Sequence, residues 1–318
     1  MEKRSPQVTV SVVTYNSSKY IIETLDSIKA QTYSNLKLIV SDDCSADNTV
    51  EIVNNWVKDN STRFLSTKVL TTEKNTGVAA NFNRAFDACD TEWLKVIAGD
   101  DLLLNNCIED YVDYIDKNPN VEVVFSRVRI FWLSWGSKKW KSSWHDYDFF
   151  SLTPKEQYDY LFEKGNHLPA PSCFYNIKRL KELNIRFDER IPLLEDYPMW
   201  IMFARKDIPF NFMDKDTVGY RMHDDSLSIG LYSPRFYKSN LLLYLYYYQD
   251  EIKAEEDRDR VYNLMCDHML KFYTKTYKTV INLRTSPEYK IGYCILHPFY
   301  VVKYIFGKIK SALLYIFN

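Results

Sequence analysis

Two adjacent carboxylates, Asp100 and Asp101, follow the apolar run of residues 93–97. Like charges this close repel one another unless a cation or hydrogen-bond donors compensate them, and a divalent metal is the expected compensator. Gly99 stands directly before the pair, and a glycine there lets the backbone turn tightly so that a bulky anionic ligand can come close. The alternative is that one of the two aspartates caps the helix expected over residues 105–118.

Three further polar clusters follow apolar runs in the first part of the chain. They are Thr14-Tyr15-Asn16, Asp42-Asp43-Cys44-Ser45 and Glu73-Lys74-Asn75-Thr76-Gly77. Carboxylates in these places can accept hydrogen bonds from a base or a ribose hydroxyl, and an aromatic ring can pack on a base. Turn and cap chemistry is the alternative, and it is the favoured interpretation for Ser45, Asp47 and Thr76. Four clusters that each follow a strand nevertheless indicate a cleft with an acidic pair for a metal-bridged diphosphate.

Alternating strands and helices must position these clusters. Strands are expected over residues 8–14, 36–41, 67–72 and 93–97, and helices over residues 18–31, 49–58 and 78–88. The first helix segment shows the spacing of a single buried face, with apolar side chains at Ile21, Ile22, Leu25 and Ile28. This alternation predicts an α/β fold with a doubly wound, mostly parallel, Rossmann-like sheet. In such a sheet the strand-to-helix loops open on one edge, where ligands bind.

Two more candidate residues lie in the second part of the chain. Asp196 precedes Pro198, and a proline in the first turn starts a helix expected to run to about residue 206. Asp196 is therefore either a plain helix cap or a carboxylate base aimed into the cleft. His223 is one of five histidines, and its alternatives are a structural role and a ligand role.

The order of these motifs carries a family likeness. It runs Val13-Thr14-Tyr15-Asn16, Asp42-Asp43-x-Ser45-x-Asp47, Asn75-x-Gly77, Gly99-Asp100-Asp101, Glu195-Asp196-x-x-x-Trp200 and Tyr220-Arg221-x-His223-x-x-Ser226. Over about residues 8 to 230 this order resembles the family 2 glycosyltransferases with the GT-A fold, of the bacterial surface-polysaccharide type.

The resemblance implies a role for each candidate residue. The nucleotide-sugar would be held by Thr14, Tyr15, Asn16, Asp42, Asp43, Asn75, Gly77 and Asp100. A Mg²⁺ or Mn²⁺ ion would be held by Asp100, Asp101 and His223, and Asp196 would be the catalytic base. Many members carry a further aspartate two residues before this pair, where this chain has Ala98, so which of the two aspartates meets the metal stays open.

The implied activity is that of an inverting, metal-dependent glycosyltransferase. It would move a sugar from a nucleotide-sugar, with a UDP-sugar as the expected donor, to a hydroxyl of a glycan or lipid-linked acceptor in cell-surface polysaccharide synthesis. The Gln-x-x-Arg-Trp motif of the processive synthases is absent, so a single addition is expected.

Composition and missing motifs exclude other classes. A formal net charge of -1 gives no electrostatic footprint for nucleic acid. Neither a P-loop nor a Gly-x-Gly-x-x-Gly follows the first strand, which disfavours P-loop NTPases and dinucleotide-dependent oxidoreductases. The remaining rivals are a nucleotidyltransferase, which would normally carry a glycine-rich basic loop near the N-terminus, and a catalytically silent binding protein.

Domain organisation and location complete the expectations. We expect a catalytic domain over residues 1–232, with a nucleotide-sugar half to about residue 110 and an acceptor half after it, and a helical region over residues 233–318. A helix over residues 299–318 would gather Lys303, Lys308 and Lys310 on one side and apolar residues opposite. This layout is typical of an interfacial helix on an anionic membrane, or of a helix that docks on protein. With no signal-peptide core, the expected location is the cytoplasm, peripheral on the inner face of the plasma membrane.

Overall fold

The computed structural model describes residues 5–132, 141–142, 147–223, 234–252 and 257–267. The chain divides into two compact units, Met1–Cys266 and Asp267–Asn318. The elements below belong to the first unit, because residues 268–318 lie outside the described residues. The expected interfacial helix over residues 299–318 lies outside them as well, so it stays a prediction.

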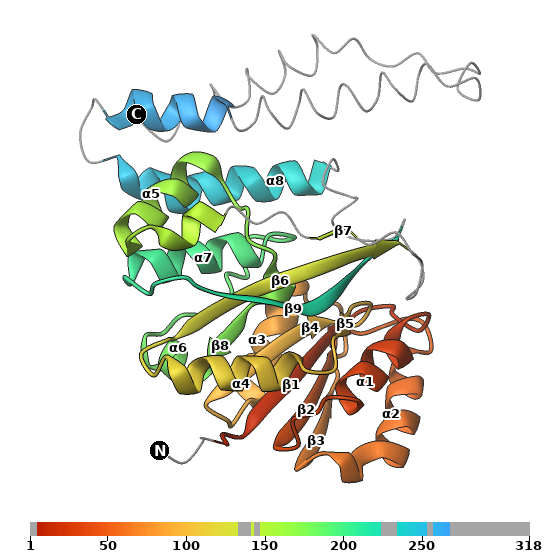
Figure 1. The fold of residues 1–318 in the computed structure, drawn as a ribbon. Coiled ribbons are helices and arrows are strands. Elements are labelled where there is room, and N and C mark those ends of the chain that lie inside the picture. The colour runs from red at the N-terminus through yellow and green to blue at the C-terminus, as the bar shows by residue number, and fades with distance from the viewer. Residues whose placement is uncertain (1–4, 133–140, 143–146, 224–233, 253–256, 268–318) are drawn as a thin grey trace, which may run out of the picture. The chain divides into compact units, whose positions relative to one another are not determined.

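The strands that carry the first polar clusters form one parallel half of the sheet, in the order β3-β2-β1-β4 (Figure 1). Their bounds are β1 Val8–Thr14, β2 Leu36–Asp42, β3 Ser66–Leu70 and β4 Trp93–Ala98. Thr14 pairs in register with Asp42, and Val13 pairs with Ala98, so β1, β2 and β4 end at the same level. The polar clusters therefore meet at one edge of the sheet, as the α/β pattern predicts.

Helices cover both faces of this half of the sheet. They are α1 Ile21–Lys29, α2 Thr49–Asn60, α3 Val78–Ala88 and α4 Cys107–Lys117. Figure 1 shows α4 in front of the sheet and α3 behind it. Every residue of β1 is buried, which requires cover on both faces because successive side chains of a strand point to opposite sides. The doubly wound architecture expected from the sequence is confirmed.

The second half of the sheet mixes strand directions. β8 Phe174–Asn176 pairs antiparallel with β4 and with β6 Val123–Trp132, and β6 pairs parallel with β9 Asn211–Met222. The short strands β5 Leu102–Leu103 and β7 Lys141–Ser142 pair antiparallel with β9 and β6. Because β5 begins directly after Asp101 and pairs with Gly219 and Val218, the end of β9 returns to the acidic pair.

The remaining helices are α5 Pro154–Lys164, α6 Ile177–Glu182, α7 Asp196–Arg205 and α8 Pro234–Leu243, with a π-helical turn over Tyr244–Tyr248 and further helix over residues 257–267. Among them, α5, α7 and α8 lie on one side of the sheet, whereas α6 lies beside β8 (Figure 1). The Tyr248 ring stacks on Phe162 of α5 at 4.2 Å, and its hydroxyl lies 2.8 Å from that of Tyr197 on α7. The turn over Tyr244–Tyr248 thus packs on α5 and α7, and the expected domain boundary near residue 232 stays a prediction.

Two element boundaries differ from the sequence expectation for local reasons. The first helix begins at Ile21 and not at residue 18, because the amides of Tyr20 and Ile21 both donate to the carbonyl of Ser17 in a preceding turn. The helix expected over residues 49–58 continues to Asn60, where a 3₁₀ turn over Ser61–Arg63 follows it. In the parts of the chain that the structure describes, no helix has the length and apolar character to span a bilayer.

Candidate active site

The ends of β1 and β4 lie in direct contact at the ligand-binding edge. The Gly99 amide donates to the carbonyl of Val13 at 3.0 Å. A Cβ atom on Gly99 would lie 2.7 Å from Thr14 Oγ1 and 3.0 Å from Ser17 Oγ, which is closer than real Cβ contacts. Glycine is therefore required here for close approach, and it holds the acidic pair against the first polar cluster.

Asn16 and Asp42 shape the loop after β2. The Asn16 amide donates to Ser45 Oγ at 2.7 Å, and its side-chain oxygen accepts from the Ala46 amide at 2.8 Å. Asp42 is 1% exposed, and its carboxylate accepts from the amide and the hydroxyl of Ser45. Tyr15, between these residues and the solvent, is 50% exposed. Asn16 and Asp42 thus build the loop, and Tyr15 and Asn16 are the members of the cluster that are exposed to a ligand.

Asp43 fixes the loop that precedes α3. Its carboxylate accepts from the amides of Thr76 and Gly77 at 2.9 and 2.8 Å, and it pairs with Arg84 at 3.1 Å. Gly77 has a φ of +94°, in the left-handed region that favours glycine. Asn75, two residues earlier, is exposed. Asp43 and Gly77 therefore hold Asn75 at the rim of the same edge.

Asp100 and Asp101 have different surroundings although they are neighbours. Asp100 Oδ2 lies 2.9 Å from His223 Nε2, and 28% of the Asp100 side chain is exposed. Asp101 is 2% exposed, and its Oδ1 accepts from the Arg221 amide at 2.8 Å. Burial and the adjacent Asp100 charge raise the pKa of Asp101 well above its usual range. Asp100 is the accessible carboxylate of the two, the buried His223 lies beside it, and Asp101 anchors the end of β9.

Arg221 locks this arrangement from the inside. Its side chain is fully buried, its Nε donates to the Asp100 carbonyl at 2.7 Å, and its Nη2 pairs with Glu23 of α1 at 2.8 Å. The guanidinium also lies over the rings of Tyr20 and Phe131, at 4.7 and 4.8 Å from their centroids. The sequence motif includes Arg221 but assigns no role to it. Nothing in the sequence distinguishes Glu23 or Tyr20, which lie at the start of α1, from the residues of any other helix.

Asp196 lies in the first turn of α7. Its Oδ2 accepts from Asn166 Nδ2 at 2.7 Å, and its Oδ1 accepts from the Tyr197 amide at 2.7 Å. Desolvation by the surrounding protein raises the pKa of Asp196, and together with the Asp196 charge it raises the pKa of Glu195 to about 8. A raised pKa makes the Asp196 carboxylate a stronger base than an exposed aspartate, which is the property that a general base needs.

The segment that leads to Asp196 is attached to α3. The Asn83 side chain exchanges hydrogen bonds with the backbone of Phe187, at 2.9 and 3.0 Å, and donates to Glu189 at 2.8 Å. Arg186 adds a two-bond ion pair with Asp87, each bond 2.8 Å long. Asp196 itself bonds to Asn166 and Tyr197 and not to the acidic pair of β4. The structure thus connects the Asp196 segment to the helix that starts at Gly77, and it gives Asp196 its own set of partners.

The donor atoms at Asp100 and His223 fit a divalent cation. Within the described ranges no group of three or more His, Cys, Asp or Glu side chains could hold a metal. A carboxylate oxygen with an imidazole nitrogen suits Mn²⁺, and Mg²⁺ binds through one or two carboxylates with phosphates and water as its other ligands. The pair is therefore a partial site that a diphosphate would complete.

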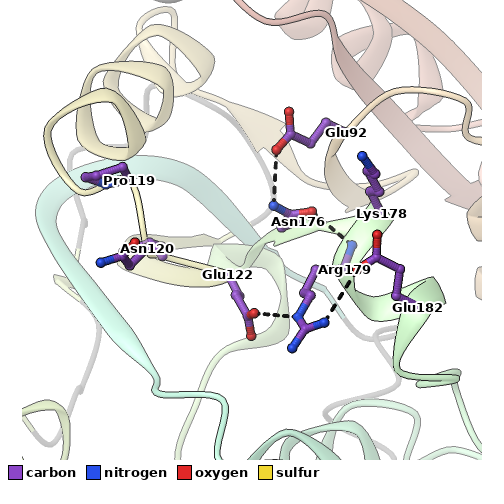
Figure 2. A pocket seen from close by; sticks show the side chains of 9 residues that line it. Glu92, Pro119, Asn120, Glu122, Asn176, Lys178, Arg179 and Glu182 are labelled. Atoms are coloured by element: carbon purple, nitrogen blue, oxygen red, sulfur yellow. Dashed lines mark hydrogen bonds and ion pairs between the residues drawn. The ribbon is translucent and has the colours of Figure 1, made fainter.

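A pocket of about 460 Å³ lies away from these residues. Figure 2 shows Arg179 between Glu122 and Glu182, with Asn176 directed toward Glu92. Glu92 precedes β4 and Glu122 precedes β6, so this pocket lies at the other end of the strands from Asp100. None of the candidate residues lines it, and its Arg179 is already paired with Glu122 and Glu182.

Several proteins with similar sequences are glycosyltransferases by name. The family described as glycosyl transferase family 2 matches residues 9–182. An uncharacterised glycosyltransferase of Methanocaldococcus jannaschii is 29% identical over 225 residues, which are 70% of this chain and 72% of that protein. A putative glycosyltransferase EpsE of Bacillus subtilis is 29% identical over 126 residues, 40% of this chain and 44% of that protein. A third relative, the UDP-Glc:alpha-D-GlcNAc-diphosphoundecaprenol beta-1,3-glucosyltransferase WfaP of Escherichia coli, is 22% identical over 242 residues, 74% of this chain and 85% of that protein.

Solved structures share the fold. S. aureus TarS 1-349 in complex with UDP-GlcNAc has a TM-score of 0.58 at 20% identity, covering 89% of this chain and 77% of that one. The mannosyltransferase PcManGT from Pyrobaculum calidifontis, in complex with GDP-Man and Mn2+, has a TM-score of 0.56 at 16% identity, covering 90% and 83%. These likenesses confirm the GT-A architecture. With the family match over more than half of its length, the chain belongs to glycosyl transferase family 2 and is a glycosyltransferase.

Proposed function

We propose that the chain transfers one sugar, with inversion, from a nucleotide-sugar to a hydroxyl of a glycan or lipid-linked acceptor in cell-surface polysaccharide synthesis. A UDP-sugar is the proposed donor, and Mg²⁺ or Mn²⁺ is the proposed cofactor. The observation that carries the proposal is the approach of His223 Nε2 to Asp100 Oδ2, 2.9 Å apart, at the edge where β1, β2 and β4 end together.

The proposal divides the nucleotide-binding residues by accessibility. Tyr15 and Asn75 are exposed at the edge and would touch the nucleotide, with the tyrosine ring against the base. Asp42 and Asp43 are buried and bonded within their loops, so they would act by shaping the site. Thr14, Asn16 and Gly77 would contribute backbone and loop shape in the same way.

The proposed chemistry needs a base at one end and a cation at the other. Asp196 would take the proton of the acceptor hydroxyl while the hydroxyl oxygen attacks the anomeric carbon. The bond to the nucleoside diphosphate breaks in the same step, and a single displacement inverts that carbon. When bound at Asp100 and His223, a divalent cation would stabilise the negative charge of the departing diphosphate.

Relatives support the classes of donor and acceptor. The name of the E. coli relative states a UDP-sugar donor and a diphosphoundecaprenol-linked acceptor. The two structural neighbours contain UDP-GlcNAc in one case and GDP-Man with Mn2+ in the other. A nucleotide-sugar donor with a divalent cation is therefore the donor chemistry that the proposal adopts.

Thermal shift against UDP-, GDP-, dTDP- and CMP-sugars, with and without Mn²⁺, tests the proposal. We expect one nucleotide class to raise the melting temperature, and more so with Mn²⁺, because a ligand that binds the folded state stabilises it by mass action. The variant Tyr15→Ala tests the proposed contact with the base: it should reduce the shift without changing the melting temperature of the free protein. An equal shift for all four nucleotides, or none, would contradict the proposed donor site.

We further propose that the protein works at the inner face of the plasma membrane, where a lipid-linked acceptor would be present. The division of lysines from apolar residues over 299–318 supports this location. Co-sedimentation with anionic vesicles should pellet the full chain more than a chain ending at Pro298. Equal pelleting of the two chains would refute the role of this helix.

A further inference from the structure

Among the described residues outside the first turn of α7, Asn166 is the only one whose side chain donates a hydrogen bond to Asp196. Its Nδ2 lies 2.7 Å from Asp196 Oδ2, although the two residues are 30 positions apart in the chain. The Tyr197 amide, at 2.7 Å, serves the other oxygen. Each carboxylate oxygen of Asp196 thus has one N–H donor, and each keeps a lone pair for a further partner.

The orientation of the Asn166 amide is fixed by a second hydrogen bond. The Leu168 amide donates to Asn166 Oδ1 at 2.9 Å. With the oxygen occupied in this way, the side chain presents its NH₂ group to Asp196. An aspartate at position 166 would present an oxygen instead, so the donor role belongs to asparagine.

Buried side chains of the core support the loop that carries Asn166. Lys95 of β4 is fully buried, and its Nζ donates to the carbonyls of Pro171 and Cys173, the latter at 3.1 Å. The hydroxyl of Tyr111 on α4 donates to the Ser172 carbonyl. The end of the loop, at residues 171–173, is therefore held from two elements of the core.

The titratable groups near Asp196 supply no positive charge to it, and burial opposes its ionisation. Glu195 adjoins it on the same segment, and Tyr175 of β8 interacts with both carboxyls. His167 follows Asn166, but its Nε2 contacts the carbonyl of Lys164 at 2.9 Å. Within the described residues the groups that favour the carboxylate form of Asp196 are neutral N–H donors, and Asn166 is the side chain among them.

We propose that Asn166 is a positioning residue, which holds the Asp196 carboxylate ionised and oriented toward the acceptor hydroxyl. The inference rests on the proposed function, since this matters for catalysis only if Asp196 acts as the base. Without the hydrogen bond from Asn166, Asp196 would keep its proton to higher pH. A smaller fraction of the enzyme would then carry the reactive carboxylate at neutral pH.

Carbodiimide labelling of the full chain tests the ionisation directly. Water-soluble carbodiimide modifies the protonated carboxyl, and tandem mass spectrometry separates Asp196 from Glu195. In Asn166→Ala the pH of half-maximal labelling of Asp196 should rise by about one unit, since a hydrogen bond to a charged group is lost. In Asn166→Asp, which keeps the size of the side chain, it should rise further because two carboxylates would face each other.

The matched control is Asn176→Ala. Asn176 also accepts a backbone hydrogen bond, from the Arg179 amide at 3.0 Å, but it lies in the pocket at the other end of the strands. Its loss should leave the labelling of Asp196 unchanged. An unchanged half-point in both Asn166 variants would overturn the inference.

A second measurement follows UDP release from UDP-glucose with an alkyl glycoside acceptor across pH. In Asn166→Ala the acidic limb of the rate profile should move up by the same amount as the labelling, with recovery at high pH. A purely structural role would lower the rate equally at every pH and would refute the positioning role. If Asp196→Asn released UDP at the normal rate, the proposed function would fail, while the labelling result would still judge Asn166.

Discussion

Two pairs of adjacent acidic residues, Asp100-Asp101 and Glu195-Asp196, experience the same like-charge repulsion in different surroundings. In the first pair Asp101 is buried against the Arg221 amide, with the charges of Arg221 and Lys95 nearby, and Asp100 faces His223. In the second pair Asp196 receives only neutral donors, from Asn166 and from the Tyr197 amide. Burial raises the pKa of Asp101 and of Asp196 alike.

The difference between the pairs separates two kinds of chemistry. The Arg221 amide holds Asp101 in place, and the partly exposed Asp100 carboxylate is the member that a metal ion could reach. The second pair has no cation partner among the residues that the structure describes, and burial raises the pKa of both Glu195 and Asp196. The first arrangement suits a site that binds a cation and a diphosphate, and the second suits a site that exchanges a proton.

The largest expected effect is at the second pair. Asp196→Asn should lower turnover by about 10²–10⁴, the usual range for a lost general base, with little change in sugar-nucleotide binding. Steady-state transfer rates together with thermal shifts by the donor measure the two effects separately. If transfer continued at a near-normal rate, the assignment of Asp196 as the base would be wrong.

The next effect concerns the cation beneath the first pair. Arg221→Met should lower the free energy of unfolding by about 2 kcal/mol, because it removes the buried donor to the Asp100 carbonyl and the ion pair with the half-exposed Glu23. Arg129→Met is the matched control, since the Arg129 side chain is 47% exposed in its pair with Asp216 and should contribute less than about 1 kcal/mol. Urea denaturation of both variants measures the free energy of unfolding. A similar decrease in the two variants would mean that Arg221 does not have this structural role.

The two members of the first pair can be separated by metal dependence. Asp100→Asn should weaken Mn²⁺-dependent UDP binding by at least about 10-fold, because a metal ligand is lost. Asp101→Asn should weaken it less, because an asparagine oxygen can still accept from the Arg221 amide. Isothermal titration of UDP with and without Mn²⁺ compares them, and the reverse order would assign the metal to Asp101.

The smallest effect is the pH dependence of stability at Glu195. Burial and the Asp196 charge raise the Glu195 pKa from 4.5 to about 8, so its protonated form stabilises the fold below about pH 4.5 and this contribution is lost as the pH rises toward 8. Glu195→Gln should therefore gain a few degrees in melting temperature relative to the wild type between pH 5 and 8. A difference in melting temperature that stays constant across this range would contradict the raised pKa.

Much of the architecture follows from patterns of local origin. Continuous apolar runs predicted β1, β2 and β4, and the polar clusters after them predicted a common binding edge, because parallel strands followed by helices must end on one side. The start of the first helix was misplaced by three residues, since the Ser17 turn satisfies backbone amides that the periodicity cannot reveal. The expectation for residues 299–318 lies outside the described residues.

The sequence by itself determined the family, the fold class and the candidate residues, because these depend on local order and spacing. Only the tertiary structure decided which partner each of these side chains has. Asp100 and Asp101 are the same residue type. They differ in their surroundings because Arg221 and His223, more than 100 residues away in the chain, contact them. Asn166 carried no signal at all, since its importance comes from a hydrogen bond to Asp196 that forms when two loops distant in the chain meet on a common core.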